Sequence, residues 1–349
     1  MNRMGKSPFS WLDRQNASAA QIEAEIASFE SRNEIRLHWI AKHHLTDGSG
    51  IANDPFPRIE EHDGYLFGIL YVPSNTTDTF AQFDELVFVA THDEIFGAYT
   101  RTDTSTADWP ALFESSSSAR VFDQSGDEGG RSIVRTLKTV VKQLLRDVEN
   151  FADVVLGISA TIGQYGNADG DVLADTHALS HRQRRKLNRA AQEQREPVSR
   201  LRREVPLMRR VIVETETVLN QLATDVIDLN TDASGSQRQL FARDLEIFIS
   251  DLYVDARHAT SVVNDIEDRL EHLIDYLKQL RAEETVAASR FTGAIASIML
   301  VPTFIVGLYG QNFDQMPERS WDHGYLFSWG LILLVTIGQV WFFRKRRWI

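Results

Sequence analysis

Two long apolar runs near the C-terminal end restrict the fold of this chain more than any other feature. Residues 291–308 form a run of 18 without a charged side chain, and residues 325–343 form another of 19. A helix of about 20 apolar residues spans the ~30 Å hydrocarbon core of a bilayer. The 16 residues between the runs, 309–324, are too few to form a domain. The sequence therefore predicts two membrane helices joined by a short loop.

The charges beside the two runs predict their orientation. Arg290 precedes the first run, a basic tail at residues 344–349 follows the second, and the loop has a single basic residue, Arg319. Basic residues favour the cytosolic side of a membrane. We therefore expect a multi-pass protein of the plasma (inner) membrane with both termini in the cytosol. Because two helices cannot enclose a hydrophilic path, transport would require an oligomer.

The composition excludes several classes of function. The formal net charge is −12 and the chain has no Cys. The negative charge disfavours a nucleic-acid partner and favours cations, and the absence of Cys removes thiolate metal sites and thiol nucleophiles. The sequence also has no phosphate-binding loop, no Gly-x-Ser-x-Gly elbow and no dinucleotide fingerprint. We expect neither an enzyme activity nor a bound cofactor.

Residues 1–125 have the pattern of an α/β cytosolic domain. A helix is expected over residues 18–31, where Ser18 and Gln21 have the spacing of a capping box. Residues 115–130 are rich in Ser and Gly and are expected to form a loop. Short β-rich runs between turn-forming residues predict strands at Ile35–Ile40, Tyr65–Val72, Leu86–Ala90 and Ile95–Thr100.

Residues 126–240 are predicted to be helical. Apolar residues have helical spacing over Ile133–Ile162, which ends at Gly163, and again over Val211–Leu229. Between them, residues 181–210 are dense in Arg and Lys. We interpret this basic segment as a solvated helix that pairs with acids elsewhere, with a nucleic-acid or lipid surface as the alternative.

The longest uninterrupted pattern leads into the first apolar run. Residues 239–301 contain no Pro and one Gly, and their apolar residues recur at three-to-four spacing. We expect a stalk helix over residues 241–290 that continues into the membrane. A single helix from Phe241 to Leu308 would be roughly 100 Å long at ~1.5 Å per residue, with a bend near Pro302.

The end of the first apolar run carries a specific motif. It reads Tyr309-Gly310-Gln311-Asn312-Phe313, and Met316-Pro317-Glu318 follows. This resembles the CorA magnesium-transporter family, whose signature Tyr-Gly-Met-Asn-Phe and following Met-Pro-Glu lie at the same place between two C-terminal spans. Residues 58–67 and 85–100 resemble the cytosolic domain of that family. The triad departs from the family at Gln311, a position that the zinc-transporting branch also varies.

The resemblance implies a fold and an activity. The fold would be an α+β cytosolic domain, a long stalk helix and two C-terminal transmembrane helices, assembled as a funnel-shaped homopentamer. The activity would be that of a passive, potential-driven channel for a divalent cation, magnesium being expected, gated by intracellular divalent cation. Its partners would be other copies of the chain, the lipid bilayer and the cation. The alternatives are a zinc- or cobalt-selective relative and a non-conducting, membrane-anchored cation sensor.

The resemblance also implies roles for single residues. Gly310, Gln311 and Asn312 would form the selectivity filter, and Asp251 a regulatory cation site. The further positions are pore-lining Thr303, Leu300, Thr292 and Asp275, the outer-mouth acids Asp314 and Glu318, and a basic cytosolic ring of Arg344, Lys345, Arg346 and Arg347. The simpler alternatives are a plain helix end for the triad, solvated helix faces for the two Asp of the stalk, and for Thr303 a hydrogen bond to its own i−4 carbonyl.

Overall fold

The computed structural model forms two compact units, Met1–Leu273 and Ile274–Ile349. It describes residues 9–48, 56–73, 83–102, 105, 107–109, 111–112, 128–164, 179–224, 227, 229, 239–241, 243–311, 321–346 and 348–349. One helix, α7 (Arg243–Tyr309), has residues in both units. Each unit is described below on its own.

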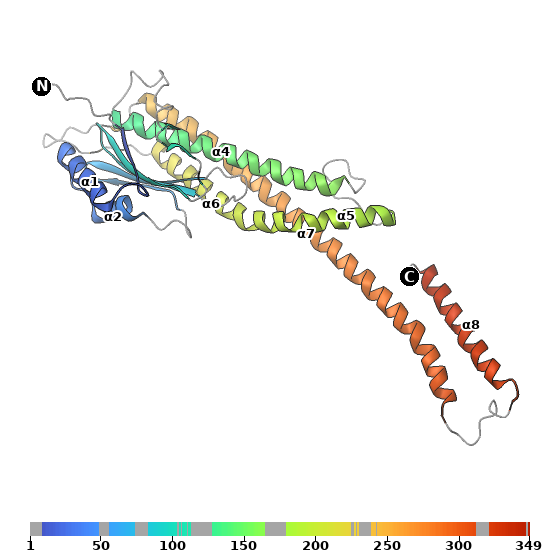
Figure 1. Ribbon diagram of the computed structural model, residues 1–349. Helices are drawn as coiled ribbons and strands as arrows, with labels where there is room; N and C mark the ends of the chain where they lie inside the picture. Colours follow the sequence, from blue (N-terminus) through green and yellow to red (C-terminus); the bar gives the residue numbers. More distant parts are fainter. Residues whose placement is uncertain are drawn as a thin grey trace. The chain divides into compact units, whose positions relative to one another are not determined.

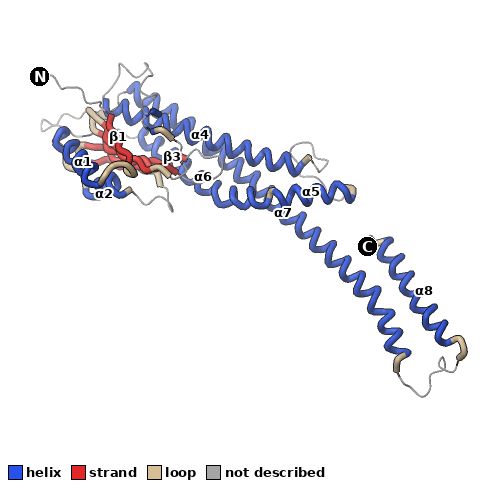
Figure 2. The backbone as a smooth tube through the Cα atoms, viewed as in Figure 1, coloured by secondary structure: helices blue, strands red, loops and turns tan. Residues whose placement is uncertain are grey.

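The first unit is built around a five-stranded sheet (Figures 1 and 2). The strands lie in the order β1-β5-β4-β3-β2, and β1 is parallel to β5 while the other neighbours are antiparallel. Every residue of β3 and β4 is buried, because helices cover both faces of the sheet. The strands are β1 (Phe9–Asp13), β2 (Arg58–His62), β3 (Tyr65–Pro73), β4 (Phe83–Ala90) and β5 (Ile95–Thr100).

Two glycines let aromatic rings lie flat on the sheet. Gly97 of β5 is paired with Trp11 of β1, and a Cβ at Gly97 would lie 2.4 Å from the Trp11 ring. Gly68 of β3 is paired with Phe88 of β4, and a Cβ there would lie 2.3 Å from that ring. Any larger residue would displace the ring, so these cross-strand contacts require glycine.

Two helices, α1 (Ala19–Asn33) and α2 (Trp39–Asp47), follow β1. The Ser18 hydroxyl accepts a hydrogen bond from the Gln21 N–H and begins α1, as the sequence predicts. The prediction of a strand at residues 35–40 is wrong. Glu34 ends α1 in the left-handed conformation, and the Leu37 N–H then donates to a carboxylate oxygen of Glu30 (2.7 Å), so the chain turns directly into α2.

The rest of the first unit is helical: α4 (Glu128–Gly163), α5 (His181–Glu193), α6 (Arg195–Thr224) and the first part of α7. α4 begins inside the segment expected to be a loop. Its Gly129 and Gly130 lie where main-chain carbonyl groups of other segments come close to the helix. A Cβ would lie 1.7 Å from the Thr91 carbonyl oxygen at the first and 2.3 Å from the Leu240 carbonyl oxygen at the second. α6 begins sixteen residues before the predicted Val211 and includes Pro206.

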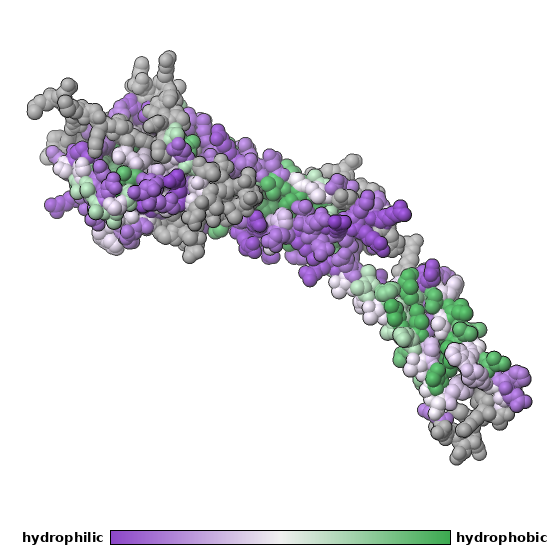
Figure 3. Space-filling view, viewed as in Figure 1, coloured by the Kyte–Doolittle hydropathy of each residue, from purple (hydrophilic) through white to green (hydrophobic). Residues whose placement is uncertain are grey.

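The second unit contains the end of α7 and α8 (Gly324–Lys345). Both helices are long and apolar enough to cross a membrane, by length and composition. Their hydrophobic side chains are exposed over this unit (Figure 3). The two predicted spans are thus confirmed as helices, and the stalk helix and first span form one continuous element.

Candidate ion pathway

The membrane part of α7 has two different faces. Ala294 and Ile305 are 0% and 8% exposed, and this side meets α8, where the Gln339 side-chain amide contacts the Ser297 main chain. The other side is uncovered within the chain. The uncovered residues include large apolar side chains such as Met299, Phe304 and Val306. They also include one helical stripe opposite α8 that is small or polar except for one Leu: Thr292, Ala296, Leu300, Thr303, Gly307 and Gly310.

Three of the predicted pore-lining residues lie on this uncovered stripe. Leu300 is 69% exposed, and Thr292 and Thr303 are also exposed. The Thr303 hydroxyl donates a hydrogen bond of 2.7 Å to the Met299 carbonyl oxygen, which is the local bond that the sequence allowed. Because the hydroxyl proton is used within the helix, the outward-facing Thr303 oxygen can act as an acceptor.

The predicted filter lies where α7 ends. The Gly310 N–H donates to the Val306 carbonyl oxygen (2.9 Å) and the Gln311 N–H to that of Leu308 (3.2 Å). Gly310 does not adopt the left-handed conformation of many helix ends. A Cβ at Gly310 would lie 3.2 Å from the Val306 carbonyl oxygen, so glycine gives room for the last helical turn. The other filter and outer-mouth residues, Asn312, Asp314 and Glu318, lie outside the described residues.

The two predicted acidic positions are exposed on α7. Asp275 forms an ion pair of 2.8 Å with Lys278, and their side chains are 74% and 66% exposed. Asp251, in the first unit, is also exposed. Among the described residues, no group of three or more His, Asp or Glu side chains is placed to hold a metal ion. A cation at either Asp therefore needs further ligands from outside this group of residues.

The basic residues at the C-terminal end of α8 lie beside aromatic rings. Arg344 and Lys345 are in the last turn, and Arg346 follows it. The Lys345 ammonium lies 5.0 Å from the centre of the Trp341 ring, and the Arg346 guanidinium 5.6 Å from that of Phe342. Such contacts let the aliphatic stems lie along apolar rings while the charges stay in water. Arg347 lies outside the described residues.

Gln339 is a polar residue of the membrane unit that the sequence did not single out. It is half-buried in α8, its Nε2 donates to the Ser297 carbonyl oxygen, and its Oε1 is buried without a hydrogen-bond partner in the described part of the chain. The sequence signal that could have identified Gln339 is its position as the one amide side chain in an apolar run of 19 residues.

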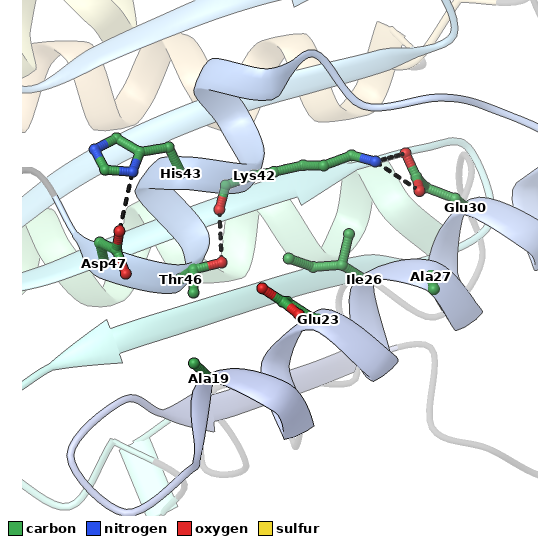
Figure 4. Close-up of a pocket in the computed structure, with 9 residues that line it drawn as sticks. All are labelled: Ala19, Glu23, Ile26, Ala27, Glu30, Lys42, His43, Thr46 and Asp47. Atoms are coloured by element: carbon green, nitrogen blue, oxygen red, sulfur yellow. Dashed lines mark hydrogen bonds and ion pairs between the residues drawn. The ribbon is translucent and has the colours of Figure 1, made fainter.

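A groove of about 460 Å³ lies between α1 and α2 (Figure 4). Its charged side chains include two ion pairs. Lys42 Nζ lies 2.7 Å from Glu30 Oε1, and His43 Nδ1 lies 3.1 Å from Asp47 Oδ2. The carboxylate of Glu23 also lines the groove, and the remaining lining residues are Ala, Ile and Thr. The residues that line it, all from α1 and α2, are separate from the predicted ion pathway on α7.

Comparison with known proteins agrees with this architecture. The model of the family described as "CorA-like Mg2+ transporter protein" matches residues 26–345 of this chain. A putative metal ion transporter of Bacillus subtilis, YfjQ, is 30% identical over 142 residues, which cover 36% of this chain and 44% of that protein. The cobalt/magnesium transport protein CorA of Thermotoga maritima is 25% identical over 163 residues, which cover 47% and 43%. The matched segments therefore span less than half the length of these curated relatives.

Solved structures share the whole fold. The complete CorA magnesium transporter of Methanocaldococcus jannaschii matches with a TM-score of 0.67 at 15% identity, over 100% of this chain and 95% of that one. The full-length CmaX protein matches with a TM-score of 0.57 at 18% identity, over 97% and 88%. A soluble α/β domain, a long helix and two C-terminal apolar helices are common to this architecture. The chain belongs to the CorA-like Mg2+ transporter family.

Proposed function

We propose that this chain assembles as a homopentamer in the plasma (inner) membrane and conducts a divalent cation, magnesium first, with both termini in the cytosol. The observation that carries the proposal is the uncovered stripe of α7, from Thr292 to Gly310, on the side that α8 leaves free. In a ring of subunits, such stripes would face a common axis and line a water-filled path. The names of the curated relatives, which are metal, magnesium or cobalt/magnesium transport proteins, support the same activity.

The chemistry of the α7 end suits a hydrated ion. Magnesium loses its water reluctantly and binds oxygen ligands. The neutral amide oxygens of Gln311 and Asn312 would hydrogen-bond to water around the ion, and weak binding lets an ion leave again. Transport would be passive, because an inside-negative potential favours entry of a divalent cation by about 4.6 kcal/mol per 100 mV, twice the value for one charge.

The acidic positions on α7 fit a regulatory role. Asp251 is exposed, and the described residues include no three-ligand group around it. A cation there would be shared between neighbouring subunits, whose carboxylates repel one another when the cation leaves. Intracellular divalent cation would thereby favour the closed state. Asp275 would form an acidic ring, and Arg344, Lys345 and Arg346 a basic ring at the cytosolic end.

Ion flux into liposomes tests the proposal. The purified protein is reconstituted, an inside-negative potential is imposed, and magnesium, zinc and cobalt influx are measured for the wild type, Asn312→Ala and Gln311→Met. We expect magnesium flux that Asn312→Ala abolishes. Flux of zinc or cobalt without magnesium would instead identify a zinc- or cobalt-selective relative, which the Gln311 departure motivates. No flux of any ion from assembled protein would leave a non-conducting cation sensor.

A further inference from the structure

The helix α5 has one strongly basic face. Arg182, Arg185, Lys186 and Arg189 follow the spacing i, i+3, i+4 and i+7, which places them on one side of a helix. The opposite side is packed against the protein, where Leu187, Ala190 and Ala191 are at most 5% exposed. The start of the helix is fixed by a capping box between Ser180 and Gln183. The basic stripe is therefore held outward on a well-defined helix.

Most of this stripe has no acidic partner in the described part of the chain. Arg189 pairs with Glu193 at 3.0 Å, but both side chains are mostly exposed, at 83% and 60%. Arg182, Arg185 and Lys186 are exposed, and no described residue forms an ion pair with them. The exposed Arg189–Glu193 pair contributes little stability. Among the described residues, Arg182, Arg185 and Lys186 therefore lack the acidic partners that were expected for the basic segment.

The second half of the basic segment behaves differently. Arg209 of α6 contacts α7, with its Nε 3.0 Å from Asn264 Oδ1 and 3.3 Å from Glu267 Oε2. Further along α6, Glu216 accepts a hydrogen bond of 2.6 Å from Thr260. The later residue of α6 therefore contacts the earlier residue of α7, so the two helices are antiparallel. The start of α6, with α5 before it, therefore lies at the end of the first unit where α7 reaches Leu273.

The charge at this end is opposite to that of the whole chain. Residues 181–203 contain nine Lys or Arg and two Glu, whereas the chain has a net charge of −12. Figure 3 shows the hydrophilic side chains gathered over α5. Along the chain, the first apolar span begins at Phe291, 18 residues after Leu273. Because the same chain carries the two apolar spans, the headgroups of the surrounding bilayer would be available to such a surface at a high effective concentration.

We propose that the basic α5 stripe binds the phosphate-bearing headgroups of anionic lipids. An anionic leaflet attracts Lys and Arg side chains that lie close to it, and clusters of four to eight on one helix suit this role. Because the apolar face of α5 is buried in the protein, the contact is electrostatic and does not insert the helix into the bilayer. The proposal is independent of which ion the protein conducts.

Energy transfer between α5 and the lipid headgroups tests this proposal. The chain has no Cys, so Gln192→Cys allows a single donor dye on α5 of the full-length protein. The labelled protein is placed in nanodiscs of phosphatidylcholine, or of phosphatidylcholine with phosphatidylglycerol, with an acceptor dye on a neutral headgroup. We expect more transfer in the anionic discs, and less of this difference as salt is raised, because salt screens exposed charges.

Two triple variants distinguish the effect of the charges on the α5 stripe from the effect of the total charge of the protein. Arg182→Gln, Arg185→Gln and Lys186→Gln together should remove most of the lipid-dependent difference in transfer. Lys142→Gln, Arg243→Gln and Arg257→Gln, which change the charge equally at exposed positions on α4 and α7, should leave it intact.

Three results would overturn the proposal. The first is equal transfer in the two kinds of disc, and the second is a difference that survives the α5 triple variant. The third is tight binding of an RNA oligonucleotide by the detergent-solubilised protein together with no lipid-dependent difference, which would make the stripe a nucleic-acid surface. If transfer to the lipid acceptor is equal in the two kinds of disc, energy transfer between labelled subunits would then show whether the stripe forms a contact between copies.

Discussion

The Gln339 side chain of α8 donates a hydrogen bond from Nε2 to the main-chain carbonyl oxygen of Ser297 on α7, at 3.1 Å. This bond crosses between the two membrane helices. The other end of the same amide, Oε1, is buried and has no partner among the described residues. An acceptor without a donor is costly where water is excluded. The contact therefore combines a favourable bond with an unsatisfied group.

Replacing Gln339 by Leu should change the stability of the helix pair very little. The substitution removes the bond, typically worth about 0.6 kcal/mol between membrane helices, and also removes the unsatisfied oxygen. We expect a change below about 1 kcal/mol in the free energy of unfolding measured in bicelles. A loss several times larger would mean that Oε1 gains a donor in the assembled protein, and would contradict the description of this amide as half satisfied.

Gly310→Ala should impair transport without preventing insertion. Its Cβ would lie 3.2 Å from the Val306 carbonyl oxygen, so the last turn of α7 must shift by a few tenths of an ångström. Small displacements at a filter change how oxygens surround the ion. We expect at least a tenfold loss of magnesium flux in liposomes. The matched control is Gly338→Ala in α8, where a Cβ meets nothing within 4 Å; equal flux in both variants would count against the prediction.

The buried carboxyl of Asp147 on α4 should make stability depend on pH. Burial is the main cause that raises its pKa from 3.8 to about 6, although Gln143 donates it a hydrogen bond of 3.1 Å. An acid whose pKa is raised by folding stabilises the fold below its unfolded pKa, and this contribution is lost as pH rises through about 6. The shift corresponds to ~3 kcal/mol.

Asp147→Asn keeps the shape of the side chain and removes the buried charge. At about pH 8 the variant should be more stable than the wild type, by up to ~3 kcal/mol, and near pH 4 the two should be equal. Thermal unfolding of the detergent-solubilised protein across this range measures the difference. Glu149→Gln, at an exposed position two residues further on, is the control. A pH-independent difference between Asp147→Asn and the wild type would refute the role of the buried charge.

Asp84 on β4 should be required for the stability of the first unit. It is fully buried, and its carboxylate accepts hydrogen bonds from the Thr102 N–H (2.9 Å), the Ser105 hydroxyl (2.5 Å) and the Trp109 ring N–H (2.9 Å). The Thr102 hydroxyl also donates to it (3.3 Å), so Asp84→Ala leaves four donors without this acceptor, and we expect a loss of about 3 kcal/mol or more in chemical denaturation. Glu61→Ala, on the exposed side of β2, should have an effect below about 0.5 kcal/mol.

The parts of the fold that were predictable from the sequence depend on local patterns. β5 begins and ends where it was predicted, at Ile95 and Thr100, and β3 extends one residue further, to Pro73. α7 and α8 follow the uninterrupted apolar spacing and the uncharged runs. In each case the residues that define the element are neighbours in the chain, so the pattern is visible before any tertiary contact is known.

The errors arise where individual side-chain contacts and close packing, which the apolar pattern does not reveal, decide the local structure. The apolar residues at 35–40 suggested a strand, but the contact of Leu37 with Glu30 and the cap formed by His38 start a helix. Gly129 and Gly130 suggested a loop, whereas their function is to fit beneath carbonyl oxygens of residues 91 and 240. β1 was not predicted, since its partner lies 86 residues away and its five residues have little pattern of their own.

The candidate site was predicted as a set of positions on one helix, and its geometry adds the distinction between the two faces. The motif places Thr303 and Gly310 along the chain, but only the packing of α8 shows that their stripe lies on the side of α7 away from α8. Gln339 could not be assigned from the sequence, because its importance depends on which main-chain group of α7 lies opposite.

The parallel pairing of β1 with β5 has a consequence for the rate and order of folding. β3, β4 and β5 are joined by short connections and can pair early, whereas Phe9 must wait for Ile95 to be in place. Closing so long a loop costs entropy before any contact is gained. We therefore expect β1 to dock after the rate-limiting barrier. Weakening its contact with the sheet, for example by Trp11→Ala, should accelerate unfolding and leave the folding rate nearly unchanged.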